Sequence, residues 1–193
     1  MHLNKNMKFF KVITSLIKTT FTHPIGQKNI FKTFFRILRW QIVSRIKNNS
    51  IENWLNDLKV ICQSGDTGFT GNLYFGLYDY DDMRFIIDFL DDKDTFLDVG
   101  SNVGAYSLIS AGICKSKTYC FEPNSKNYSK LLKNLEINAL TNVFPFNLAI
   151  SEKKGFMRFS SNLGPENYLL STTEDSDIEV DLLETRDLDS FTF

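Results

Sequence analysis

A short stretch near the middle of the chain, FLDVGSNVGAYS from Phe96 to Ser107, combines an acidic residue with two closely spaced glycines. Asp98 follows apolar residues, and Gly100 and Gly104 complete the pattern D-x-G-x-x-x-G. This pattern is typical of a buried strand that turns sharply into a helix. Backbone N–H groups at the start of that helix can hold a polar or anionic group, and the glycines let a ligand approach the backbone. The stretch therefore indicates a ligand-binding turn.

A second acidic residue, Glu122, ends another apolar run 24 positions after Asp98. In an open α/β sheet, ligands bind beyond the carboxyl ends of the strands, where a carboxylate can accept hydrogen bonds from two ribose hydroxyls. The aspartate beside the turn favours a cationic group on the ligand. A ribose together with a charged amino-acid end predicts S-adenosylmethionine as the cofactor.

Two other interpretations of the turn stay open from the residues alone. A lone D-x-G-x-x-x-G can be an ordinary connection between a strand and a helix. A doubly wound, nicotinamide-dependent oxidoreductase would place a carboxylate similarly, but the absence of G-x-G-x-x-G counts against it. The presence of Glu122 at the end of the next strand favours a nucleoside ligand.

The elements around these residues alternate between strand and helix. Such alternation predicts an α/β fold with a Rossmann-like parallel sheet and right-handed crossovers. The predicted strands cover residues 95–99, 118–123 and 142–150, and the predicted helices cover residues 105–114 and 124–140. The same patterns predict strand-like structure over 73–79, a helix over 81–92, an outer strand over 155–161, and a strand at the start of 178–191.

The charge of the chain is divided unevenly. Residues 1–50 contain ten Lys and Arg and no acidic residue, whereas the remainder contains twelve basic and 23 acidic residues. This division predicts a basic, helical N-terminal region over 1–50 and a cofactor-binding domain over 51–193. Nucleic acid is not expected as a partner, because the acidic domain would repel phosphates.

Two amphipathic helices are predicted in the basic region, over residues 8–21 and 28–47. The wide, Phe-rich stripe of the second helix favours a cap that packs on the sheet with its Lys and Arg in water. Contact with a membrane surface is the alternative. The residues of the stripe are Phe31, Phe34, Phe35, Leu38, Ile42 and Ile46.

Cysteine and histidine are scarce in the chain. Three cysteines without a C-x-x-C pair and two histidines predict no disulfide framework and no metal site. These counts favour a reducing, cytoplasmic location. No uncharged apolar run of the length of a transmembrane helix occurs in the sequence.

Three segments together resemble the FkbM-type methyltransferases, a family of class I S-adenosylmethionine-dependent enzymes. They are TFLDVGSNVGAYSLIS, CFEPNSKNYSKLLKNLEINAL and NLAIS. The stretches GFTGNLYFGLYDYDDMRFIIDFL and HPIGQKNIFKTFFRILRWQIVSRI resemble the part of that family that precedes its cofactor domain. The resemblance covers the chain from about residue 22 onward.

The resemblance implies roles for individual residues. Asp98, Gly100, Asn102 and Gly104 would surround the methionine part of the cofactor. Glu122 would hold the ribose, and Pro123 would shape the turn after it. Asn147 and Ala149, at the end of the third strand, would meet the adenine.

The resemblance also implies an activity and a departure from the family. The implied activity is O-methylation of a small-molecule or glycan hydroxyl, with no catalytic base identified. Family members continue beyond the segment corresponding to Thr185–Phe191 into a strand that ends in Asp-Val-Glu-Gly. Because this chain ends at Phe193, the methyltransferase-type sheet is expected to lack C-terminal strands. A non-catalytic remnant, or a nucleoside-binding module of the same fold, is therefore the alternative to an active enzyme.

Overall fold

The computed structural model describes residues 14–63, 68–160 and 180–191. The chain begins, within these residues, with a helical segment over 14–22. Residues 8–13 of the first predicted helix lie outside the described part. The next elements are α2 (Pro24–Lys28), α3 (Ile30–Ile46), the strands β1 (Asn49–Asn53) and β2 (Lys59–Gln63), α4 (Thr70–Phe75) and α5 (Tyr80–Phe89). Strands β1 and β2 pair as an antiparallel hairpin, and the expected boundary after residue 50 falls inside β1.

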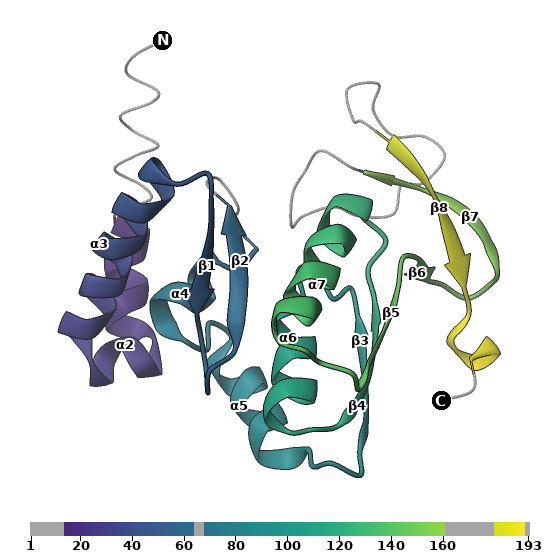
Figure 1. The fold of residues 1–193 in the computed structure, drawn as a ribbon, viewed down its shortest axis with the longest axis horizontal. Coiled ribbons are helices and arrows are strands. Elements are labelled where there is room, and N and C mark those ends of the chain that lie inside the picture. The colour runs from purple at the N-terminus through teal and green to yellow at the C-terminus, as the bar shows by residue number, and fades with distance from the viewer. Residues whose placement is uncertain (1–13, 64–67, 161–179, 192–193) are drawn as a thin grey trace.

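The centre of the molecule is a parallel sheet in the order β3-β4-β5, which confirms the predicted Rossmann-like α/β fold. Strand β3 (Thr95–Val99) is followed by α6 (Ala105–Leu108), which continues into the π-helical turn η1 (Ile109–Ile113). Strand β4 (Lys117–Phe121) is followed by α7 (Ser125–Ile137) and β5 (Val143–Phe146). In Figure 1, α6 and α7 lie between this sheet and the β1–β2 hairpin, so they bury one face of the sheet.

A second small sheet follows in the order β6-β8-β7. Its strands are β6 (Ala149–Ile150), β7 (Gly155–Ser160) and β8 (Val180–Arg186), and the short helix η3 (Leu188–Ser190) comes last. The predicted outer strand is therefore confirmed as β7, at the edge of this sheet. The single strand predicted over 142–150 is instead divided between β5 and β6. The chain turns at Asn147, whose side-chain amide donates to the carbonyls of Glu122 and Pro123 and ties the end of β5 to the loop after β4.

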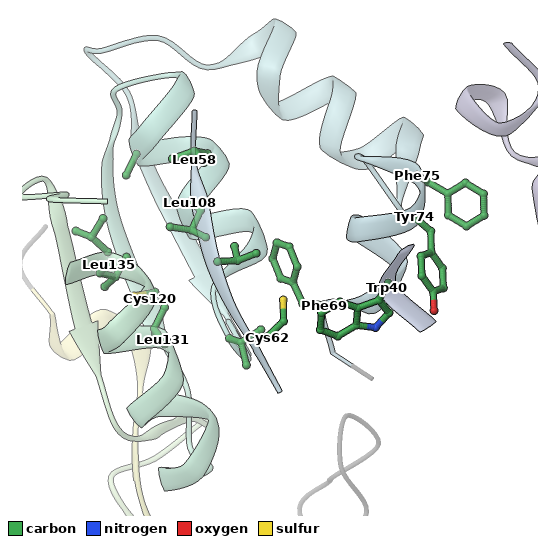
Figure 2. Close-up of a cluster of buried hydrophobic side chains, with 14 residues drawn as sticks. Trp40, Leu58, Cys62, Phe69, Tyr74, Phe75, Leu108, Cys120, Leu131 and Leu135 are labelled. Atoms are coloured by element: carbon green, nitrogen blue, oxygen red, sulfur yellow. The ribbon is translucent and has the colours of Figure 1, made fainter. Parts of the chain in front are cut away.

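Alternate residues of β4 build the core on the two faces of the sheet, as the strand geometry requires. Cys120 lies on the helix-covered face, in one buried cluster with Leu108 and Leu131 (Figure 2). Tyr119 and Phe121 belong to a separate cluster. Trp40 of α3 joins the first cluster, so the helical region and the sheet share one core.

The strand predicted over 73–79 is wrong. The aromatic residues there favour a strand by propensity, but residues 70–75 form α4, and Tyr74 and Phe75 are buried. Tertiary packing overrides propensity here, because α4 packs against α3. Gly76 ends the helix with a φ of 86°, a conformation that glycine adopts without strain.

The predicted orientation of the second amphipathic helix is also wrong. Helix α3 buries Thr33 and Trp40, and the predicted core-facing stripe points into solvent. The reason is that the opposite face of the helix meets the core, where Trp40 is buried and Ile37 and Val43 pack against the same cluster. The side chain of Arg39 also bonds the buried carboxylate of Glu52 at 2.5 Å, which holds that side of the helix against β1.

Candidate functional site

The turn after β3 adopts the left-handed backbone that its glycines predict. Gly100 and Gly104 have φ values of 83° and 93°, and Asn102 between them has a φ of 52°. The N–H groups of Gly100 and Ser101 donate to the carbonyl of Phe121 at 2.9 and 3.0 Å. The turn is therefore fastened to the end of β4, next to Glu122.

Asp98 lies in β3 and is 8% exposed. One of its carboxylate oxygens accepts a hydrogen bond from the hydroxyl of Ser107 at 2.5 Å. Burial raises the pKa of Asp98 to about 6, and the hydrogen bonds from Ser107 oppose that shift. The free site therefore holds a carboxylate whose charged form is poorly solvated.

Glu122 follows β4 and is 5% exposed. Its two oxygens accept hydrogen bonds from the backbone N–H groups of Asn102 and Asn124, both at 2.8 Å. Burial raises the pKa of Glu122, hydrogen bonds from the backbone of Asn124 and Asn102 and from the side chain of Asn127 lower it, and the charge of Asp98 raises it. A carboxylate has roughly four lone-pair sites, so these three bonds leave about one site for a ligand.

Among the described residues, no Lys, Arg or His forms a salt bridge with Asp98 or Glu122. Buried charges in proteins are normally paired. Two buried carboxylates without a cation, at the carboxyl ends of adjacent parallel strands, make a site suited to a cationic ligand.

The hydroxyl of Ser101 is buried and has no hydrogen-bond partner among the described residues. Ser101 lies in the same turn, between Gly100 and Asn102. A buried hydroxyl is normally hydrogen-bonded, so an unpartnered one in this turn is consistent with a site that a polar ligand completes.

Of the three remaining predicted site residues, two lie at the same end of the sheet as the carboxylates and one does not. Pro123 is buried directly after Glu122. Asn147 follows β5, and its amide bonds the carbonyls of both Glu122 and Pro123, so it lies at the same end of the sheet. Ala149 begins β6, where it pairs with Thr185 in the second sheet, and does not lie at the end of β5.

Sequence reasoning missed three residues of this site. Ser101 and Ser107 carry no signal beyond their places in the turn and in the first turn of the helix after it. Asn134 of α7 is fully buried, accepts from the N–H of Ile61 at 2.8 Å, and donates to the carbonyl of Val103 at 2.9 Å. It joins β2 to the turn after β3, and its signal was a polar residue on the apolar face of α7.

A cavity of about 750 Å³ reaches the turn at Asn102. Its wall is about equally polar and apolar and comes from the helical segment over 14–22, α3, α4 and the residues after them. The polar side chains of the wall include Gln41, Arg45, Tyr74 and Asp79. Gln41 bonds both Tyr74 and Arg45, and Asp79 accepts from the hydroxyl of Tyr106 at 3.3 Å.

The described residues contain no disulfide and no cluster of metal-binding side chains. Cys62, Cys114 and Cys120 do not form disulfides with one another, and burial raises the pKa of Cys120 to about 12. Within the described ranges, no group of three or more His, Cys, Asp and Glu could hold a metal ion. None of the helices there combines the length and the apolar character that a membrane crossing requires.

No family model and no curated protein matches the chain. Several solved structures are partly similar. A TYW2 from M. jannaschii in complex with AdoMet is 19% identical with a TM-score of 0.43, over 52% of this chain and 43% of that one. A TYW2 from P. horikoshii in complex with MeSAdo is 12% identical with a TM-score of 0.45, over 64% and 50%.

A SAM-dependent methyltransferase from Agrobacterium tumefaciens is 10% identical with a TM-score of 0.43, over 65% of this chain and 44% of that one. In these three matches the chain spans half or less of the length of the solved structure. The function of the site is therefore interpreted from its own geometry.

Proposed function

We propose that this chain is an S-adenosylmethionine-dependent methyltransferase of the class I, FkbM-type kind. The observation that carries the proposal is the pair of buried carboxylates at the carboxyl ends of β3 and β4, Asp98 and Glu122, which form no salt bridge with any described residue. A sulfonium cofactor with an α-ammonium group supplies positive charge to such a site, and its ribose supplies the hydrogen-bond donors.

The residues present fit this cofactor. Glu122 accepts hydrogen bonds from Asn102, Asn124 and Asn127, and its remaining acceptor capacity is available to a ribose hydroxyl. Asp98 attracts the cationic amino-acid end, and the free hydroxyl of Ser101 is a further polar partner. When bound, S-adenosylmethionine supplies an electrophilic methyl group.

The acceptor in this proposal is a hydroxyl of a sugar or another polar small molecule. The cavity that reaches Asn102 has a volume typical of a small-molecule site and a wall that combines apolar surface with several polar side chains. The chain's contribution is to hold the acceptor hydroxyl close to the cofactor turn. Asp79 is the carboxylate of this wall that can accept the hydroxyl proton. Burial raises the pKa of Tyr106, and the charge of Asp79 raises it further, so the phenol stays protonated.

Calorimetric titration of the full chain with S-adenosylmethionine tests this function. Saturable binding of S-adenosylmethionine without binding of NADH supports the proposal. A folded chain that binds neither compound, or that binds NADH alone, contradicts it. Transfer of a labelled methyl group to members of a sugar panel then separates an enzyme from a binding module.

The affinity for S-adenosylmethionine is expected to rise about tenfold between pH 5 and pH 7. A bound cation favours the ionised form of Asp98, so its pKa is lower in the complex than the value of about 6 in the free chain. Below pH 6 the free site must therefore lose a proton to bind, and above pH 6 it is already ionised. Calorimetric titrations between pH 5 and pH 7 measure how the affinity depends on pH, and the substitution Asp98→Asn should remove this dependence. An unchanged dependence in that variant would assign the proton to another group.

A further inference from the structure

One face of α3 presents a continuous row of large apolar side chains to solvent. They recur every three or four residues, so they lie in line along the helix. Their exposed fractions are 92% for Phe31, 39% for Phe34, 67% for Phe35, 60% for Leu38, 52% for Ile42 and 76% for Ile46. Single exposed apolar residues are ordinary on protein surfaces, but a contiguous row of this size marks an interaction site.

Basic residues border this row, and α3 itself contains no acidic residue. Lys32 and Arg36 lie four residues apart along one side of it, and Lys28 precedes the helix in α2. No Asp or Glu occurs between residues 14 and 50. Arg39 is paired with Glu52, whereas Lys28, Lys32 and Arg36 form no salt bridge with any described residue.

We propose that the exposed row of α3 docks on a membrane surface that contains anionic lipids. A helix with an apolar face and basic flanks lies in the plane of the membrane interface, with the apolar side chains among the acyl chains and the cations at the headgroups. Helix α3 has 17 residues and is about 25 Å long. The whole row can therefore insert at once when the helix lies flat.

Charge favours an anionic membrane over a second copy of the chain at this face. A second copy using the same row would bring another basic helix against Lys32 and Arg36, and like charges repel. Anionic headgroups instead attract these residues, by roughly fivefold in affinity for each cation near the surface. The acidic remainder of the chain is repelled from the same surface.

The chain contains a matched control for the apolar part of the proposal. Phe85 and Phe89 of α5 are 61% and 68% exposed and stack on each other. Helix α5 carries Asp81, Asp82 and Asp88, so an anionic surface repels it. Substitution of Phe85 on α5 removes an exposed aromatic side chain, as substitution of Phe35 on α3 does, but it should leave lipid binding unchanged.

Flotation of the full chain with vesicles tests the proposal without any cofactor, so its outcome is independent of the methyltransferase assignment. Vesicles of phosphatidylcholine alone are compared with vesicles that also contain phosphatidylserine. We expect binding only to the phosphatidylserine vesicles. The double variant Phe35→Gln, Leu38→Gln should lose at least tenfold in partitioning, and Lys32→Glu should lose binding as well. The variant Phe85→Gln should bind as the unchanged chain does.

Three results would overturn the proposal. The first is the absence of binding to phosphatidylserine vesicles by a chain that is folded by circular dichroism. The second is an equal loss of binding in Phe85→Gln and in the α3 variant. The third is a dimer of the unchanged chain in light scattering that becomes a monomer in the α3 variant alone. This result would assign the row to contact with a second copy.

Discussion

Replacing Glu122 with glutamine is expected to weaken S-adenosylmethionine binding by about a hundredfold. Glutamine has nearly the same shape but only one acceptor oxygen. One backbone N–H, that of Asn102 or Asn124, then loses its partner, and the ribose loses a charged acceptor. Calorimetric titration measures the change in Kd.

The control for this variant is Glu136→Gln, an exposed glutamate near the end of α7. It removes the same charge from the same domain, so it separates the local role of Glu122 from a change in net charge. Equal affinities of the Glu122→Gln variant and the unchanged chain would remove Glu122 from the site.

Replacing Asn134 with alanine is expected to lower the free energy of unfolding by about 3 kcal/mol. The variant leaves two buried backbone groups, the N–H of Ile61 and the carbonyl of Val103, without partners, and it also leaves a small cavity. Urea unfolding followed by circular dichroism measures the loss.

Asn138→Ala supplies the comparison for this prediction. Asn138 lies one helical turn further along α7 and bonds the backbone of Lys59 in β2 in the same way, but at a more exposed place. Water can replace its bonds, so we expect a loss of about 1 kcal/mol. Similar losses in both variants would show that burial does not decide the contribution of Asn134.

Local patterns predicted the centre of the fold well. The strand β3 ends in Asp98 and a left-handed glycine turn, as the D-x-G-x-x-x-G spacing indicates, and Glu122 follows the adjacent parallel strand. Both features depend on residues close together in the sequence. The alternation of strand and helix then determines that the two carboxylates meet at one end of the sheet.

The features that sequence reasoning missed depend on contacts between distant segments. Helix α4 forms where propensity favours a strand because it packs against α3. The apolar residues of the exposed row on α3 have the same helical spacing as the residues of a core-facing stripe. Periodicity alone therefore cannot show whether such a face is buried or exposed. Asn134 is recognisable only once α7, β2 and the turn are side by side.

Strand β3 has a neighbour on one side only within the described part of the chain, since it pairs with β4 alone. In a parallel strand the amide groups point alternately to the two sides. The β3 amides therefore alternate between bonding β4 and facing away from it. Hydrogen exchange along this strand is expected to divide into a slow set and a fast set. Because Asp98 belongs to this edge, a ligand that engages it also restrains the end of the strand against fraying. Ligand binding at the site should therefore slow the opening of this sheet edge, because both involve the same strand of five residues.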